Sequence, residues 1–163
     1  MDMNQFDLFC MEEALAEAQK AFEMEEVPVG AVLAMDGKII SRAHNLVETL
    51  QDATAHAEIL CLRAASQLLK DFRLVGSTLY VTLEPCSMCA GALILSRVDK
   101  IIYGASDPRH GAAGSWVNLF EKDHPIHTVK MASGLLAEEA KALMQQFFKE
   151  RRACKILKPS LRK

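Results

Sequence analysis

The chain lacks several features that would assign it to a specialised class of protein. No internal repeat, low-complexity stretch or linker rich in proline, glycine and serine interrupts its 163 residues, so nothing indicates a second domain. No apolar run approaches the roughly 18 residues that a membrane-spanning helix needs. The first seven residues carry acids where a secretory signal would carry basic residues. We therefore expect one soluble, cytoplasmic domain that does not engage a membrane.

Cysteine is too scattered for a disulfide framework. Two of the five cysteines form a C-x-x-C pair, which leaves Cys10, Cys61 and Cys154 without any pairing pattern. We expect these three as reduced thiols. Cys61 lies five residues after His56, about 140° further round a helix, so it is not expected to share a metal with that histidine. A buried position among apolar side chains suits Cys61 better.

The formal net charge of −2 hides a basic C-terminus. Residues 149–163 hold seven lysine and arginine residues against one glutamate, a net charge of +6, which leaves −8 on the preceding 148 residues. A basic tail can neutralise the phosphates of a nucleic acid, and a solvated chain end is an equally good interpretation of the charge alone. We place a folded domain over residues 1–152 and a basic C-terminal tail over residues 153–163.

The apolar pattern predicts helices that alternate with strands. Helices are expected over about 6–25, 56–69, 86–96 and 135–152, and strands over 27–35, 38–43, 77–83, 100–104 and 127–131. Asp36-Gly37 is a strong signal for a tight hairpin. Thr54 or Asp52 can cap the second helix, and Pro85 suits the first turn of the third. The order predicts an α/β fold: a three-layer α/β/α sandwich with a mixed central sheet of about five strands.

Two short motifs gather the residues that can hold a metal. Residues 56–58 read His-Ala-Glu, an H-x-E motif, and residues 85–89 read Pro-Cys-Ser-Met-Cys, a P-C-x-x-C motif. Cys86 and Cys89 lie three residues apart at the start of a helix, which puts both sulfurs on one side of it. With His56 they make three protein ligands, whereas structural zinc sites usually have four. The open fourth position indicates a catalytic site for one zinc ion per chain.

Glu58 is the carboxylate left free for proton transfer beside this metal site. His56 and Glu58 lie about 200° apart on a helix, so both reach the metal site only if the helix points its N-terminus at it. We therefore expect two helix N-termini to converge on the site. The pairing of H-x-E with P-C-x-x-C is typical of zinc-dependent base deaminases, in which the glutamate is general acid and base. A closed structural zinc site and a non-catalytic zinc-binding partner subunit stay open as alternatives, and Glu58 argues against the latter.

Beyond these motifs the chain resembles the bacterial tRNA adenosine deaminases, within the cytidine deaminase superfamily. The similarity spans about residues 7–152. Its matching segments are 27–32, Asn45, 54–58, 82–92 and 111–115. The zinc motif alone leaves open a deaminase of a free base or nucleotide, of cytidine, deoxycytidylate or guanine type. The resemblance implies instead that a homodimer, with each active site composed partly from the neighbouring chain, converts the wobble adenosine of a tRNA anticodon loop to inosine.

The resemblance also implies roles for individual residues. It implies zinc ligands at His56, Cys86 and Cys89 and a proton shuttle at Glu58. It implies substrate contacts from Asn45, Val29, Ala57 and Asp107.

The chain departs from the family pattern at two positions. Ala53 stands where proline is common, which should loosen the loop that enters the helix of the H-x-E motif. Ser106 replaces the commoner arginine before Asp107, which should alter the phosphate contacts of that loop. The loop belongs to a long connection, residues 105–125, and connections of this length are usually functional or mobile.

Overall fold

The computed structural model describes residues 3–157, with side chains through Cys154. A five-stranded sheet has the order β2-β1-β3-β4-β5. Its strands are β1 (Gly30–Met35), β2 (Lys38–His44), β3 (Ser77–Leu83), β4 (Lys100–Ala105) and β5 (Lys130–Ser133). β1 is antiparallel to both β2 and β3, whereas β3, β4 and β5 run parallel to one another. The sheet is therefore mixed, as predicted.

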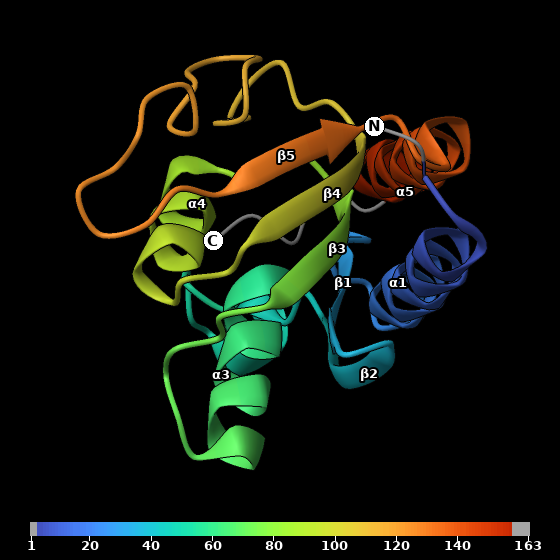
Figure 1. The fold of residues 1–163 in the computed structure, drawn as a ribbon. Helices are drawn as coiled ribbons and strands as arrows, with labels where there is room; N and C mark the ends of the chain where they lie inside the picture. The colour runs from blue at the N-terminus through green and yellow to red at the C-terminus, as the bar shows by residue number, and fades with distance from the viewer. Residues whose placement is uncertain (1–2, 158–163) are drawn as a thin grey trace.

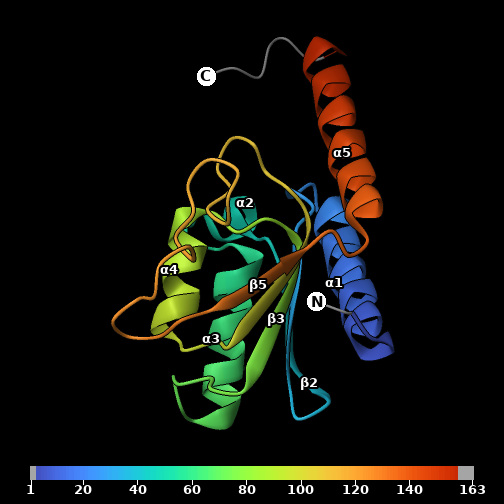
Figure 2. The ribbon, with the colours of Figure 1, turned by 45° about the horizontal axis from the view of Figure 1, so that its top comes forward.

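Helices cover both faces of this sheet. The helices are α1 (Gln5–Glu23), α2 (Val47–Leu50), α3 (Ala57–Leu69), α4 (Ser87–Leu95) and α5 (Ala137–Leu157). α3 and α4 lie on one side of the sheet, and α1 and α5 lie on the other (Figures 1 and 2). The predicted three-layer α/β/α sandwich is confirmed.

Alternation along the strands divides the core between these faces. Leu33, Leu79 and Ile101 pack toward α3 and α4, whereas their neighbours Val32, Tyr80 and Ile102 pack toward α1. Successive strand side chains point to opposite faces, so an apolar run such as residues 31–34 fills both layers at once. This is the burial expected when helices cover both faces of a sheet.

Local sequence signals explain several element boundaries. Asn4 and Asp7 form a capping box at the start of α1, each side chain accepting the other residue's backbone N–H at 2.9 Å. The predicted hairpin turn is also present. Asp36 and Gly37 have φ angles of 51° and 70°, as the turn that joins two antiparallel strands with a two-residue loop requires.

Other boundaries differ from the prediction. The N-cap of α3 is His56, without a side-chain cap; Thr54 instead donates to Asp52 in the preceding turn, so the predicted caps are wrong. Pro85 lies before the N-cap of α4, Cys86, and not in the first turn. The last strand begins at Lys130, three residues later than expected, because the parallel pairing of Lys130 with Lys100 sets its register.

The C-terminal helix is longer than predicted. α5 continues through Leu157 and does not end at Arg152, and part of the predicted basic tail, residues 158–163, lies outside the described residues. α2 was not predicted at all, since a single turn leaves no periodic pattern. Among residues 3–157, no helix is both long and apolar enough to cross a membrane.

The topology brings several chain segments to one end of the sheet. β3 and β4 are parallel, so their carboxyl ends at Leu83 and Ala105 lie together, and β1 begins beside the end of β3 because that pair is antiparallel. α3 and α4 both begin at this end. The crevice outside the carboxyl ends of strands is the usual place for a ligand in open α/β sheets.

Candidate active site

The three predicted metal ligands come together at the N-termini of two helices. His56 is the N-cap of α3, Cys86 is the N-cap of α4, and Cys89 lies in the first turn of α4. The His56 Nδ1 atom lies 3.6 Å from the Cys86 sulfur and 3.5 Å from the Cys89 sulfur. The two helix N-termini therefore converge as the spacing of the motifs predicted.

The donor set fits a tetrahedral zinc ion. Zinc bonds of about 2.3 Å to sulfur and about 2.0 to 2.1 Å to nitrogen place two ligand atoms about 3.6 Å apart at a tetrahedral angle. The observed separations of 3.5 and 3.6 Å match this value. In the part of the chain that the structure describes, no other group of three histidine, cysteine or acidic residues has metal-ligand geometry.

The two cysteines form a coupled pair of thiols. A hydrogen bond from the Cys89 thiol, supported by His56, lowers the pKa of Cys86 to about 3. Donating that bond raises the pKa of Cys89, and burial raises it further. The hydrogen bond with Cys86 raises the pKa of His56. The pair thus gives up one proton readily, and one thiolate is available as a ligand before any metal arrives.

Glu58 lies in the first turn of α3, beside this cluster. Only 4% of its surface is exposed. Burial raises its pKa to about 7, although the positive field of His56 favours the charged form. A carboxyl group with a pKa near 7 can both accept and return a proton at neutral pH. The arrangement is that of a general acid and base next to a metal site.

Three of the four predicted substrate contacts line the same end of the sheet. Asn45 follows β2, and its backbone N–H donates to the Val29 carbonyl at 3.0 Å. Ala57 directly follows His56 and is fully buried in one core cluster with Val29. These residues form a wall made of the start of β1, the end of β2 and the start of α3.

Asp107 reaches this end of the sheet from β4. It lies two residues beyond the strand, and its Oδ1 atom accepts the backbone N–H groups of Arg109 at 3.0 Å and His110 at 3.4 Å. The carboxylate therefore closes a turn in the long connection. Ser106 and Ala53, the two departures from the family pattern, are both exposed.

Two buried glutamates beside the site were missed by the sequence analysis. Glu26 accepts the backbone N–H groups of Glu48 at 3.2 Å and Thr49 at 2.6 Å, together with the Asn45 side-chain amide at 3.3 Å. It therefore fixes the Asn45 amide and the start of α2. A glutamate placed directly before an apolar run, as Glu26 is before residues 27–35, was the available signal.

Glu84 is the second missed carboxylate, and only 2% of its surface is exposed. Its pKa is lowered: burial alone would raise it, but hydrogen bonds from the Ser115 hydroxyl and from the backbone of Asp107, Ser115 and Ala113 outweigh burial. A charged residue between an apolar strand and P-C-x-x-C was the available signal. Its hydrogen-bond partners could not be predicted from local sequence, because they lie 23 to 31 residues further along the chain.

The remaining histidines have other partners. His44 Nδ1 lies 2.7 Å from Glu17, and His127 Nε2 lies 3.1 Å from the Val98 carbonyl oxygen. Neither histidine joins the metal-binding group.

The other cysteines differ sharply in access. Cys10 and Cys61 are fully buried, and burial raises their pKa values to about 11 and about 12. The Cys61 thiol packs against Ser41, 3.1 Å from its hydroxyl, away from the metal-binding group. Cys154 is exposed on α5.

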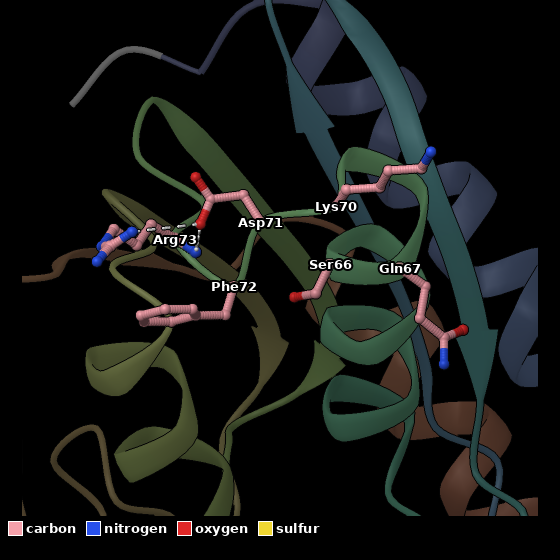
Figure 3. A pocket seen from close by; sticks show the side chains of 6 residues that line it. All are labelled: Ser66, Gln67, Lys70, Asp71, Phe72 and Arg73. Atoms are coloured by element: carbon pink, nitrogen blue, oxygen red, sulfur yellow. Dashed lines mark hydrogen bonds and ion pairs between the residues drawn. The ribbon is translucent and has the colours of Figure 1, made fainter.

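A shallow hollow lies at the opposite end of α3 from His56 (Figure 3). It is formed by the last turns of α3 and the segment that follows, and its lining residues are Ser66, Gln67, Lys70, Asp71, Phe72 and Arg73. In the figure the Arg73 side chain turns toward Asp71, with which it forms an exposed ion pair at 3.7 Å. Residues 57–65 of α3 lie between His56 and the first lining residue, Ser66, so the hollow is not part of the site.

Comparison with known proteins agrees with this geometry. The profile of the MafB19-like deaminase family matches residues 3–152. The fold and the site therefore define a deaminase of the cytidine deaminase-like class.

Individual relatives show which family of deaminases the chain belongs to. The tRNA-specific adenosine deaminase of Bacillus subtilis is 51% identical over 150 residues, which cover 92% of each chain. The chloroplastic tRNA(adenine(34)) deaminase of Arabidopsis thaliana is 49% identical over 89% of this chain, a region that makes up 12% of that longer protein. A solved structure of a tRNA:A34 deaminase, studied for A-to-I editing at the wobble position, superposes with a TM-score of 0.80 at 46% identity, over 83% of this chain and 98% of that one. The chain belongs to the tRNA-specific adenosine deaminase family.

Proposed function

We propose that this protein hydrolyses adenosine to inosine at the wobble position of a tRNA anticodon. The observation that carries the proposal is a three-donor metal site with an adjacent buried carboxylate, Glu58, in a chain 51% identical to a tRNA-specific adenosine deaminase. The reaction adds water at C6 of adenine and releases ammonia, so it needs an activated water and a group that moves protons. Glu58 is placed to move them.

His56 through Nδ1, and Cys86 and Cys89 through their sulfurs, would hold one Zn²⁺ ion per chain. Bound zinc supplies a Lewis acid that lowers the pKa of a coordinated water to about 7. The three residues present one imidazole and two sulfur donors, which suit zinc better than magnesium or calcium.

Glu58 carries the proton transfers in this proposal. Its carboxylate accepts a proton from the attacking water and delivers it to the ring nitrogen next to C6, which makes that carbon more electrophilic. It then helps to protonate the departing amine, which leaves as ammonia. A pKa of about 7 allows both directions of transfer near neutral pH.

The substrate residues surround this centre. Val29 and Ala57 form an apolar wall, Asn45 offers an amide held in place by Glu26, and Asp107 follows the end of β4. The pocket requires a base outside a stack, and a single-stranded anticodon loop presents one.

Several wider properties follow from the same proposal. A tRNA substrate supports a cytoplasmic location, which we propose for this enzyme. We propose a homodimer in which each active site includes residues of the neighbouring chain, with residues 1–152 as the deaminase domain and the basic residues beyond them as an RNA contact. Lys149, Arg151 and Arg152 directly precede that tail on α5, and their exposed basic side chains support an RNA contact at this end of the chain.

The test compares a tRNA bearing a wobble adenosine with the same tRNA bearing guanosine there, and with free cytidine, adenosine, guanine and deoxycytidylate. Inosine is scored by sequencing and ammonia release by a coupled assay. We expect inosine only at the wobble position, and none with Glu58→Ala at unchanged zinc content. Turnover of a free base or nucleotide with tRNA left intact would replace the substrate assignment by that of a small-molecule deaminase.

A further inference from the structure

Glu84 occupies the junction between the sheet and the metal-binding helix. It directly follows Leu83 at the end of β3 and precedes Pro85 and Cys86, and its backbone N–H donates to the Ala105 carbonyl at 2.8 Å. Its side chain is buried although no basic side chain in residues 3–154 pairs with it. A buried carboxylate without a counter-ion has to be stabilised by hydrogen-bond donors.

All donors to this carboxylate come from one segment, residues 107–115. Oε2 accepts the Asp107 N–H at 2.9 Å and the Ser115 hydroxyl, and Oε1 accepts the N–H groups of Ala113 at 3.0 Å and Ser115 at 3.1 Å. Hydrogen bonds to a charged acceptor are about twice as strong as bonds between neutral groups. The Glu84 side chain is thus hydrogen-bonded to both ends of the segment.

The same segment is joined to the metal-binding motif through the backbone. The Ala112 N–H donates to the Pro85 carbonyl at 2.8 Å, and Gly111 forms an isolated β-bridge with Cys86. Gly111 permits this approach, because a Cβ atom there would overlap the Glu84 carboxyl group and lie 2.6 Å from the Asp107 carbonyl oxygen. In Figure 2 the connection between β4 and β5 passes over the end of the molecule where α4 begins.

We propose that Glu84 is a positioning residue: it fixes the 107–115 segment against the start of α4 and so sets where Asp107 stands relative to the metal site. The role in substrate binding rests on the proposed function, in which Asp107 contacts the nucleotide. Glu84 itself touches neither substrate nor metal. Its effect passes through the Asp107 N–H, which it holds directly, and through Gly111, which lies beside Cys86.

The two carboxylate oxygens of Glu84 accept different donors, so one substitution should affect the two ends of the segment differently. In Glu84→Gln the side-chain oxygen can stay at the Oε1 position and keep the Ala113 and Ser115 N–H bonds. The amide nitrogen then faces the Asp107 N–H, so that two donors oppose each other, while the Ser115 hydroxyl can rotate to accept. The Asp107 end of the segment should therefore loosen while the Ala113 end stays attached.

The experiment measures amide hydrogen exchange and steady-state kinetics on the zinc-loaded protein. Glu84→Gln should raise the exchange rate of the Asp107 amide about tenfold and that of the Ala113 amide much less. It should raise KM for the wobble-adenosine tRNA about tenfold and change kcat by less than about threefold, with zinc content unchanged. Glu121→Gln makes the same chemical change at an exposed position of the same long connection and should match the wild type in every measurement.

Two results would overturn the proposal. One is unchanged Asp107 exchange in Glu84→Gln. The other is a lower melting temperature with KM unchanged, which would leave Glu84 a purely structural role. The exchange measurement needs no RNA, so it tests the attachment of the segment even if the substrate assignment fails.

A second variant covers the case in which Glu84→Gln does not fold. Gly111→Ala leaves the carboxylate intact, and its Cβ atom would push the segment away from Glu84 and from the Asp107 carbonyl. Gly111 does not have a positive φ, so alanine adds no strain at its own φ angle. It should raise Asp107 exchange and KM in the same direction as Glu84→Gln. Wild-type exchange and KM in Gly111→Ala would count against the proposal.

Discussion

Glu58 and Glu84 both lie close in sequence to metal-binding residues and expose only 4% and 2% of their surface, and yet their environments shift their pKa values in opposite directions. Burial raises the pKa of Glu58 to about 7, whereas four hydrogen bonds outweigh burial and lower the pKa of Glu84. The region at the start of α3 therefore holds a carboxyl group that can exchange its proton. The region at the end of β3 holds one that stays charged. Solvent exposure alone therefore does not decide which behaviour a buried glutamate shows; the hydrogen-bond donors that face its oxygens also count.

The sharpest way to test this comparison is to remove the proton-exchanging carboxyl group. Glu58→Gln keeps the shape of the side chain and cannot act as a base, so we expect deamination to fall roughly 10²- to 10⁴-fold. Zinc content and the melting temperature should stay close to the wild type. Activity within tenfold of the wild type would mean that another group moves the proton, and the two glutamates would then differ in their hydrogen-bond donors but not in a catalytic role.

The two glutamates should also give opposite pH dependences of folding. In the zinc-free protein the pKa of Glu58, about 7 when folded, lies above the unfolded value of about 4.3, so its ionisation opposes folding. Relative to Glu58→Gln, the wild type should gain up to about 3 kcal/mol of unfolding free energy as the pH falls from about 8 to about 4.

Glu84 should behave in the opposite sense, because its pKa is lowered in the folded state. Relative to Glu84→Gln, the contribution of Glu84 is fully present above the unfolded value of about 4.3 and is lost as the pH falls through the folded value. Urea unfolding at a series of pH values checks both slopes. If both carboxyl groups changed the unfolding free energy in the same direction with pH, the predicted difference between Glu58 and Glu84 would be wrong.

A third prediction concerns stability at pH 7. Glu84→Gln places an amide opposite the Asp107 N–H and should lower the free energy of unfolding by about 1.5 to 3 kcal/mol. Glu121→Gln, with the same change at an exposed position, should stay within about 0.5 kcal/mol of the wild type. Chemical denaturation of the two variants side by side is the measurement, and equal stabilities would show that the Glu84 hydrogen bonds contribute little.

The smallest effect is expected from a single donor. Ser115→Ala removes the hydroxyl that donates to Glu84 and leaves three backbone donors in place. We expect a loss of about 1 kcal/mol and a small upward movement of the Glu84 pKa. NMR titration of the carboxyl carbon checks the direction, and a downward movement would show that the hydroxyl does not stabilise the charged form.

Sequence patterns predicted most of the fold because the relevant signals are local. Asp36-Gly37 fixed the hairpin through two positive φ angles, and the spacing of Cys86 and Cys89 fixed the sulfur pair on the first turn of a helix. The convergence of α3 and α4 was also predictable, since His56 and Glu58 can reach one metal site only from a helix end. These features depend on a few adjacent residues each.

What the sequence did not reveal depends on distant contacts. Nothing near Glu84 in the sequence indicates its role, because its partner Ser115 lies 31 residues later. Glu26 likewise gains its role from Asn45, Glu48 and Thr49, 19 to 23 residues away. The start of β5 was misplaced for the same reason, because its register is set by β4. The N-cap of α3 was predicted at Thr54 or Asp52 because these residue types commonly cap helices. The actual N-cap, His56, makes no side-chain capping hydrogen bond.

The unequal access of the five cysteines gives the protein a built-in set of chemical reporters. Cys154 on α5 is open to a thiol-reactive dye in the folded state, whereas Cys10 and Cys61 are fully buried and have raised pKa values that keep them unreactive until the chain unfolds. Cys86 and Cys89 would be shielded whenever a metal holds them. Counting modified thiols in one sample would therefore distinguish a metal-loaded molecule, a metal-free molecule and an unfolded one without any introduced label.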